Sequence, residues 1–303
     1  MDEPLDCLIV GGGPAGLTAA TYLARFHLKL KLVDGGKSRA ATIPCTHNHA
    51  GFPNGISGAD LIARMKEQAQ LYGAVIEDGF VGRIESGDGG FVAEWGCGPV
   101  AAMTVLLATG VSNRRPSMDE AAHDAALAAG LIRYCPICDG YEVTDKRVAV
   151  IGTGEKGVAE TLFLRSFTAD LTLFAPEGPH DLSNEDRAAL AEAEIRIFDG
   201  PVAIEPGQDS IEVVVAGKGQ AFDSLYPALG SDTHTQLAEM LGARLNEAGC
   251  IGVDAHQRTS VPGLYAAGDV VIGLDQISHA MGDGGVAATT IRNDLAKESP
   301  LWR

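Results

Sequence analysis

Basic residues are scarce in this chain of 303 residues, where 23 Lys and Arg face 40 Asp and Glu. The formal net charge of −17 disfavours nucleic acid and anionic membranes as partners, because both attract cationic surfaces. No apolar run is long enough to span a bilayer, and the first residues lack the basic and apolar segments of a secretory signal. These absences predict a cytoplasmic protein that binds neither membrane nor nucleic acid.

Cysteine is also sparse, and only two of the six residues stand close together in the sequence. The four scattered residues are Cys7, Cys45, Cys97 and Cys250. Single cysteines without a partner in sequence do not form the framework of a secreted, disulfide-rich protein. This distribution again favours a cytoplasmic address.

The remaining two cysteines, Cys135 and Cys138, form a C-x-x-C pair that Asp139 follows directly. Two thiols at this spacing can close a disulfide, and an adjacent carboxyl group can exchange a proton with a thiolate. A zinc site is one alternative, but zinc needs four ligands and no second C-x-x-C or H-x-x-x-H is present, so no metal is predicted. Two buried structural cysteines are the other alternative. The motifs on either side favour the redox pair.

Glycine is abundant, with 38 residues, and the first cluster lies in a β-α-β pattern. A strand is predicted over 6–10, a helix to about residue 26 and a second strand over 30–34. Between the first strand and the helix, Gly11, Gly13 and Gly16 complete G-x-G-x-x-G, and Asp34 ends the second strand. In this fingerprint the glycines permit a tight turn, close approach of a pyrophosphate and close helix packing, while the acid binds a ribose hydroxyl. The pattern predicts dinucleotide binding.

A second β-α-β pattern begins near residue 147. It has a strand over 148–151, a helix to about residue 167 and a strand over 171–174, with Gly152, Gly154 and Gly157 again in G-x-G-x-x-G. Further helices are predicted over 58–72, 233–245 and 280–296. The length and the two patterns indicate an α/β protein with two dinucleotide folds.

The order of motifs resembles that of the low-molecular-weight thioredoxin reductases. The matching segments are Gly11–Gly16, Asn48 with Gly51-Phe52-Pro53, Ala108-Thr109-Gly110, Cys135–Asp139, Gly152–Gly157 and Gly263–Asp269. The resemblance implies two Rossmann-like domains: a discontinuous FAD-binding domain over 1–116 and 245–303, and an inserted pyridine-nucleotide-type domain over 117–244 that carries the C-x-x-C. It also implies a homodimer, and a thioredoxin-like protein or a small-molecule dithiol or disulfide as partner.

The resemblance assigns roles to individual residues. Cys138 would face the flavin, Cys135 would attack the partner's disulfide, and Asp139 would act as acid and base. The expected FAD-binding residues are Gly11, Gly13, Pro14, Ala15, Gly16, Asp34, Asn48, Ala108, Thr109, Gly110, Gly268, Asp269, Gln276, Ile277, His279 and Ala280. A second nucleotide would lie on Gly152, Gly154 and Gly157.

Two of the residues near the C-terminus admit two interpretations each. His279 would stabilise reduced flavin or shuttle a proton, or it would simply bond to local backbone at a helix start. Trp302 would cap the flavin or a neighbouring subunit, or it would belong to a frayed terminus.

One segment departs from the family pattern. Members that use NADPH carry a His-Arg-Arg cluster and a further Arg after the second-domain strand, whereas this chain has no Arg or Lys between Asp170 and Asp186 and places Glu177 there. Arg binds phosphate through a planar fork, and an acid repels it. We therefore expect a flavoenzyme that exchanges electrons between FAD and the Cys135–Cys138 pair without NADPH, with NADH as the second choice. The alternatives are an ordinary NAD(P)H-dependent thioredoxin reductase, a dithiol oxidase that uses oxygen, and a non-catalytic flavoprotein.

Overall fold

The chain folds into two compact units in the computed structural model, which describes residues 3–87, 89–96 and 98–302. Unit 1 consists of residues 1–43, 56–112 and 233–303, and unit 2 consists of residues 44–55 and 113–232. Cys97 lies outside the described residues. The structure confirms the predicted α/β class with one Rossmann-like fold inserted into another. The contact boundaries fall at residues 112 and 233, against the expected 116 and 245, and the loop 44–55 groups with unit 2.

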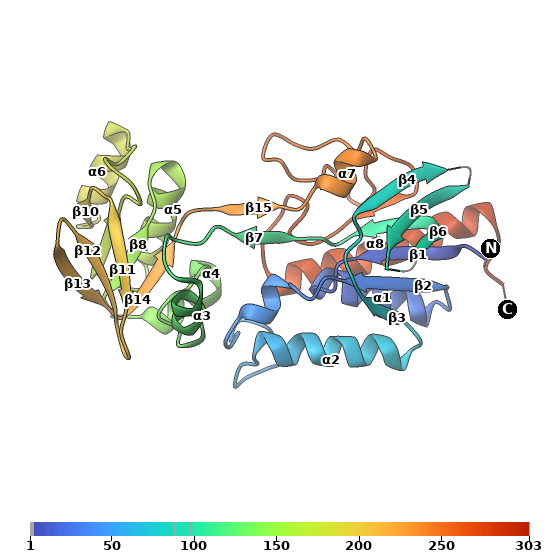
Figure 1. The fold of residues 1–303 in the computed structure, drawn as a ribbon, viewed down its shortest axis with the longest axis horizontal. Coiled ribbons are helices and arrows are strands. Elements are labelled where there is room, and N and C mark those ends of the chain that lie inside the picture. The colour runs from blue at the N-terminus through green and yellow to red at the C-terminus, as the bar shows by residue number, and fades with distance from the viewer. Residues whose placement is uncertain (1–2, 88, 97, 303) are drawn as a thin grey trace. The chain divides into compact units, whose positions relative to one another are not determined.

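Unit 1 is built on a seven-stranded sheet (Figure 1). Its strands are β1 (Leu5–Val10), β2 (Leu30–Asp34), β3 (Val75–Asp78), β4 (Arg83–Gly87), β5 (Gly90–Trp95), β6 (Gly98–Leu107) and β16 (Leu264–Ala266). The order is β3-β2-β1-β6-β5-β4, and β16 also pairs with β6. Strands β1, β2, β3 and β16 run parallel to their neighbours, whereas β4 and β5 are antiparallel. The carboxyl ends of β1, β2, β6 and β16 therefore meet at one edge.

The helices of unit 1 are α1 (Pro14–Arg25), α2 (Gly58–Leu71), α7 (Gln236–Met240) and α8 (Ile277–Glu298), with a short 3₁₀ turn η1 (Arg39–Thr42). Helix α1 packs against α2 and α8. A Cβ atom on Gly284 of α8 would lie 2.2 Å from the carbonyl oxygen of Ala15, so only glycine permits this close approach. The expected helix over 233–245 was too long. Thr233 belongs to a strand, and Gly242 adopts a φ of 74° after the helix ends.

Unit 2 contains a parallel sheet in the order β10-β9-β8-β14, with β8 (Val148–Ile151), β9 (Leu171–Phe174), β10 (Arg196–Phe198) and β14 (Ser224–Pro227). An antiparallel sheet adds β11 (Val202–Pro206), β12 (Ile211–Val215) and β13 (Lys218–Phe222). The helices are α3 (Glu120–Ala128), α4 (Pro136–Asp139), α5 (Gly154–Leu164) and α6 (Asn184–Glu192), with a 3₁₀ turn η2 (Gly140–Val143). The strands β7 (Val111–Asn113) and β15 (Ser231–Thr233) pair in a two-stranded ribbon, which carries two of the crossings between the units.

Two cores hold unit 2 together, one on each face of its parallel sheet. On one face Val158 and Leu164 of α5 and Leu190 of α6 pack against β8 and β9. On the other face Phe222 of β13 and Ala126 of α3 pack against the same sheet. Side chains alternate between the faces of each buried strand, so both faces are apolar, as parallel strands require.

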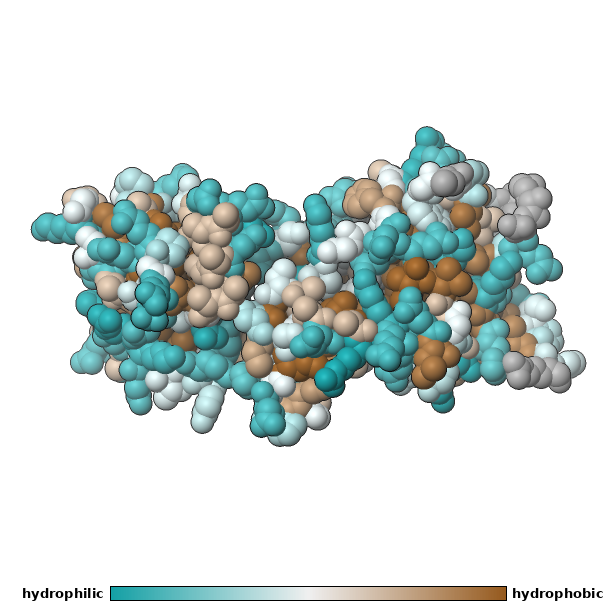
Figure 2. Space-filling model, turned by 60° about the horizontal axis from the view of Figure 1, so that its bottom comes forward, coloured by the Kyte–Doolittle hydropathy of each residue, from teal (hydrophilic) through white to brown (hydrophobic). Residues whose placement is uncertain are grey.

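The visible surface in Figure 2 is mostly hydrophilic, with hydrophobic residues confined to separate patches. Within the described ranges, no helix is both long and apolar enough to cross a bilayer.

Candidate redox centre and cofactor cradle

The structure closes the predicted thiol pair into a disulfide. Cys135 and Cys138 lie at the start of α4 in unit 2, with their sulfur atoms bonded and their Cα atoms 5.2 Å apart. Pro136 occupies the first turn of this helix, where its missing N–H costs no hydrogen bond. The Cys138 N–H lies 3.1 Å from the Cys135 sulfur and donates to it. A backbone donor aimed at a sulfur stabilises the thiolate that reduction produces.

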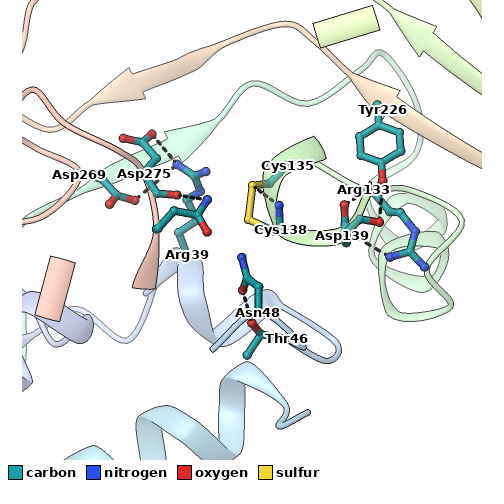
Figure 3. Close-up of a disulfide and its surroundings, with 11 residues drawn as sticks. Arg39, Thr46, Asn48, Arg133, Cys135, Cys138, Asp139, Tyr226, Asp269 and Asp275 are labelled. Carbon is teal, nitrogen blue, oxygen red and sulfur yellow. Dashed lines mark hydrogen bonds and ion pairs between the residues drawn. A yellow bond between two sulfur atoms is a disulfide. The ribbon is translucent and has the colours of Figure 1, made fainter. Parts of the chain in front are cut away.

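The carboxyl group of Asp139 points away from the disulfide in Figure 3, toward Arg133 and Tyr226. Arg133 Nη1 lies 3.1 Å from Oδ2, and the Tyr226 hydroxyl donates to Oδ1 at 2.8 Å. Burial raises the pKa of Asp139, and Arg133 and Tyr226 oppose this rise because both stabilise the ionised form. The expected proton exchange between Asp139 and a thiolate remains a prediction.

Sequence reasoning missed both partners of Asp139. Arg133 lies before α4, but Tyr226 lies on β14, and no local spacing links it to the disulfide. Tyr226 is fully buried, and burial raises the pKa of its hydroxyl, so the group remains a hydrogen-bond donor. A buried Tyr hydroxyl requires a partner, but the sequence does not identify which one.

A second hydrogen-bond chain, from Tyr134 through the buried His123 to the exposed Asp124, precedes Cys135. The hydroxyl of Tyr134 lies 2.7 Å from Nε2 of His123, and Nδ1 of His123 lies 2.9 Å from Asp124 Oδ1. His123 is buried on α3, and Tyr134 packs in the core of unit 2. These contacts fix the segment that leads into the redox pair.

Asn48 lies next to the disulfide, as Figure 3 shows, in the loop that groups with unit 2. Its Oδ1 accepts a hydrogen bond from Thr46 Oγ1 at 3.0 Å. The same loop carries Cys45, which is exposed, whereas Cys7 is buried in β1 and burial raises its thiol pKa to about 12. Asn48 was expected as an FAD ligand, and that role remains a prediction.

In unit 1 the first glycine motif lies at the sheet edge where β1 and β6 end. Gly11 has a φ of 115°, and a Cβ atom there would lie 2.2 Å from the carbonyl oxygen of Ala108, so the tight turn requires glycine. Ala108 N–H donates to Val10, and Thr109 Oγ1 donates to the carbonyl of His234 at 2.7 Å. These bonds fix Ala108, Thr109 and Gly110 beside the motif.

The end of β16 and the start of α8 meet the same motif. A Cβ atom on Gly268 would lie 2.9 Å from that of Ala15 and 3.6 Å from that of Ala280. Gln276 is the N-cap of α8, and Ile277 begins the helix. Nδ1 of His279 lies 3.5 Å from Asp283 Oδ2, a side-chain contact within α8, and both interpretations of this histidine remain predictions. The described structure thus gathers three separate sequence motifs at one place.

Two acidic side chains border this edge. Asp34 ends β2 and accepts from Gly36 N–H at 2.9 Å and from Lys66 Nζ at 2.6 Å. Asp269 follows β16, and Arg39 lies 3.5 Å from its carboxylate (Figure 3). Burial and the nearby Asp275 raise the pKa of Asp269 to about 6, against the opposing charge of Arg39. Such carboxylates can accept hydrogen bonds from the hydroxyl groups of a ribityl chain or a ribose.

The residues of unit 1 fit an FAD molecule. A Cβ atom on Gly13 would meet only Ser38 Oγ at 3.5 Å, so the motif leaves open space where a pyrophosphate approaches. Helix α1 begins at Pro14 and directs its free N–H groups and dipole toward that space. Trp302 is 88% exposed in the single chain, and neither interpretation of it is tested.

The second glycine motif joins β8 to α5 in unit 2. A Cβ atom on Gly157 would lie 2.8 Å from the Gly152 carbonyl carbon, which shows the close strand-to-helix packing of this fingerprint. Gly154 begins α5. No group of three or more His, Cys, Asp or Glu side chains in the described ranges is placed to hold a metal ion.

Two Rossmann-like folds, one carrying a redox-type disulfide, define a dinucleotide-dependent disulfide oxidoreductase. The chain belongs to the pyridine nucleotide-disulphide oxidoreductase family, whose model matches residues 5–284. It is 32% identical to the thioredoxin reductase of Treponema pallidum (strain Nichols) and 30% identical to that of Peptoclostridium litorale, over 95% of this chain and 96% of each relative. The crystal structure of thioredoxin reductase from Streptococcus pyogenes MGAS5005 superposes with a TM-score of 0.88 at 26% identity and covers 98% of this chain and 100% of that one. The chain is a thioredoxin-reductase-like, FAD-dependent enzyme.

Proposed function

We propose that the protein exchanges electrons between FAD and a protein or small-molecule dithiol through Cys135 and Cys138, without NADPH as the donor. The observation that carries this proposal is the closed Cys135–Cys138 disulfide at the start of α4, with the Cys138 N–H on the Cys135 sulfur. The family supports the flavin, and the glycine motif of unit 1 supplies its cradle.

In the proposed reaction a partner thiolate attacks the Cys135 sulfur, and the Cys135–Cys138 bond breaks. The second partner thiol then attacks the mixed disulfide, so the partner leaves oxidised and both cysteines are reduced, with two electrons and two protons transferred. FAD, when bound, is the two-electron carrier between this pair and an acceptor such as dioxygen. Arg133 and Tyr226 hold the carboxyl group of Asp139, and its proton exchange with a cysteine of the pair is part of this proposal.

The segment that follows β9 supports the proposal that NADPH is not the electron donor. The Gly11 N–H donates to the Val33 carbonyl and the Gly152 N–H donates to the Phe174 carbonyl, both at 2.9 Å. Because Val33 and Phe174 thus hold equivalent positions in the two folds, the residue equivalent to Asp34 is Ala175. Ala175 is buried and offers no carboxylate for a ribose, and Glu177 is exposed. We rank the outcomes for flavin reduction as neither nucleotide first, NADH second and NADPH last.

Oxidation of dithiols with oxygen is the form of this activity that these observations favour over an ordinary NAD(P)H-dependent reductase. Without a nucleotide route, electrons enter from thiols. The partner is a thioredoxin-like protein or a small dithiol. A homodimer and a cytoplasmic location complete the proposal, the latter because the scattered cysteines suit a reducing compartment.

The test is turnover of the FAD-loaded protein in air with reduced thioredoxin or dithiothreitol, measured as oxygen consumed and peroxide formed. Cys135→Ser and Cys138→Ser are each expected to reduce turnover at least a hundredfold while the protein stays yellow. In a second arm, anaerobic protein is mixed with NADPH or NADH and flavin bleaching is followed. Fast bleaching by micromolar NADPH together with no dithiol-driven peroxide would restore the ordinary reductase.

A further inference from the structure

The segment 176–182 of unit 2 returns over the second glycine motif and bonds to it. The Gly154 N–H donates to the Asp181 carbonyl at 2.9 Å, and the Asp181 N–H donates to Thr153 Oγ1 at 2.8 Å. The same hydroxyl lies 3.3 Å from Nδ1 of His180. Three contacts therefore fasten His180 and Asp181 to the turn on which a dinucleotide would lie.

The glycine motif of unit 1 provides an internal comparison. Gly13 is the counterpart of Gly154, and among the described residues none accepts a hydrogen bond from its N–H. A dinucleotide pyrophosphate binds to backbone N–H groups of this turn and of the helix start. In unit 1 the Gly13 N–H can therefore donate to a ligand, whereas in unit 2 the equivalent Gly154 N–H already donates to the Asp181 carbonyl.

A second set of contacts holds the segment from the opposite side. The His180 N–H donates to Asp199 Oδ1 at 2.9 Å, and the Gly200 N–H donates to the Gly178 carbonyl at 2.6 Å. A Cβ atom on Gly200 would lie 2.5 Å from the Ala175 carbonyl oxygen, so the two strands of chain are in direct contact. The segment is thus fixed between the glycine motif and the chain that follows β10.

His180 is the residue of the segment that points inward. It is 7% exposed, and its Nε2 is buried without a hydrogen-bond partner in the described structure. Burial lowers the pKa of the imidazole, which favours its neutral form.

Charge adds to this closure. Glu155 follows the second glycine of the motif, Asp181 is bonded to the motif through its backbone, and both side chains are exposed. Lys156 is exposed at the same helix start, and Arg187 lies close enough to His180 to influence it. The two carboxylates oppose the cations that remain, so no net attraction offsets the lost backbone donor.

We propose that His180 and Asp181 are specificity-determining residues that close the second dinucleotide fold to both NADPH and NADH. This inference rests on the proposed function, in which electrons enter from thiols. It goes further because it attributes the exclusion of both nucleotides to the fixed position of the segment 176–182 and not only to the missing arginines. Adding cations alone is therefore insufficient to create a nucleotide site.

Four holoprotein variants test this assignment by isothermal titration with NADPH and NADH. Thr153→Gly with His180→Gly releases the segment. Ala175→His, Pro176→Arg and Glu177→Arg together form the cation variant, which adds basic side chains to a closed segment, and a further variant combines all five substitutions. Pro179→Ala is the matched control, because Pro179 is exposed in the same segment and its side chain takes no part in the contacts above.

Wild type, the control and the cation variant are expected to show no saturable binding up to millimolar nucleotide. The released variant should bind NADH at least tenfold more tightly than wild type, and the full combination should bind NADPH more tightly still. Hydrogen exchange supplies a second measurement: the Gly154 and Asp181 amides should be protected in wild type and exchange faster in the released variant.

Tight NADPH binding by the cation variant alone would overturn the closure while leaving the thiol-driven function intact. Nucleotide binding by wild type would overturn the closure and the exclusion of NADPH together. A released variant that gains no affinity, whether or not its amides exchange faster, would show that these residues do not set specificity. Failure of dithiol turnover, by contrast, would contradict the proposed function without touching any of these binding results.

Discussion

Cys135 and Cys138 are covalent partners with different surroundings, and this difference bears on the roles that we propose for them. The Cys138 N–H donates to the Cys135 sulfur, and Cys135 is the N-cap of α4. A thiolate at Cys135 therefore receives a backbone donor after the disulfide opens. This supports Cys135 as the thiol that exchanges with the partner.

We expect Cys138→Ser to accumulate a stable mixed disulfide between Cys135 and a thionitrobenzoate probe, because the Cys138 thiol that would resolve it has been removed. Cys135→Ser should accumulate much less. Intact-mass spectrometry measures both, in a Cys45→Ser background that removes an exposed competing thiol. Preferential labelling of Cys138 would reverse the two roles.

Tyr226 and Arg133 both donate hydrogen bonds to the carboxyl group of Asp139, which follows the redox pair. Tyr226→Phe removes the 2.8 Å hydrogen bond to the carboxylate without changing the ring. The free energy of unfolding is expected to fall by about 2 kcal/mol, as for other bonds to charged acceptors. The pKa of Asp139 should rise further, because the lost donor favoured the ionised form.

Urea unfolding measures the first effect of Tyr226→Phe, and the pH profile of thiol exchange measures the second. The part of the pH profile that reports ionisation of Asp139 should move to higher pH. Tyr141→Phe is the control, since Tyr141 is exposed on the neighbouring turn η2. Unchanged stability together with an unshifted limb would show that the hydroxyl does not act on Asp139.

At the scale of elements, a substitution in the turn between β1 and α1 can separate an effect on FAD binding from an effect on folding. Gly13 has an ordinary φ of −82°, and a side chain there would meet only Ser38 at 3.5 Å. Gly13→Val should therefore fold but lose FAD, because the side chain fills the space that a pyrophosphate needs. Flavin absorbance per subunit and circular dichroism provide the two measurements.

Gly82→Val serves as the control for Gly13→Val, because a Cβ atom on Gly82 would have no neighbour within 4 Å. It should keep both its fold and its colour. A folded Gly13→Val protein that remains equally yellow would place the flavin elsewhere.

Helix α8 is tied to the neighbourhood of β16 through one carboxylate. Asp294 accepts from Arg258 Nε at 2.7 Å and Nη2 at 2.9 Å, and from the Tyr265 hydroxyl at 3.0 Å. These donors, Arg258 above all, hold the pKa of Asp294 well below its usual range, with help from Lys297. A depressed folded pKa adds stability above the unfolded value of about 4 that is lost as the pH falls further.

Asp294→Asn is accordingly expected to lower the free energy of unfolding at pH 7 by about 2 kcal/mol, the scale of hydrogen bonds to a charged group. The difference from wild type should shrink as the pH drops from about 4 toward 2. Denaturant titrations across this range measure it, with Asp209→Asn in an exposed turn as the control. A constant difference at all pH values would exclude the ion pair as its source.

Elements with strong local signals were predictable from the sequence. Strand β2 was predicted with its observed ends, because Leu30–Asp34 is an apolar run bounded by turns. The β8 and β9 strands were equally clear, since both are buried on two faces. The expected helix over 233–245 failed because Thr233 pairs in the β7–β15 ribbon, a contact between distant segments.

The candidate site divides in the same way. The glycine motifs and the C-x-x-C carry their geometry in their spacing, so the sequence identified them. The contact of Asp139 with Tyr226 and that of His180 with Thr153 join residues that are 87 and 27 positions apart. No periodic pattern encodes such pairs. The loss of cations after β9 was visible in the sequence, but the return of that segment over the motif required the fold.

At the scale of the whole molecule, the excess of acidic residues is distributed unevenly between the two units. Unit 2, which carries the disulfide, has 21 Asp and Glu against 10 Lys and Arg, a difference of −11 out of the total of −17. A field of this sign attracts cationic partners and slows the approach of anionic ones. Because thiol exchange requires encounter with a second molecule, this field should affect the rate at which partners arrive rather than the chemical step.

Three dithiol peptides test this expectation. They share a central C-x-x-C sequence and are flanked by lysines, by serines or by glutamates. At low ionic strength kcat/KM should follow the order lysine, serine, glutamate, with kcat nearly equal for all three. The differences should shrink as salt is raised from about 0.01 M to 1 M, because the Debye length falls from about 30 Å to about 3 Å. Preference for the glutamate peptide would mean that local cations such as Arg133, rather than the overall charge, select the partner.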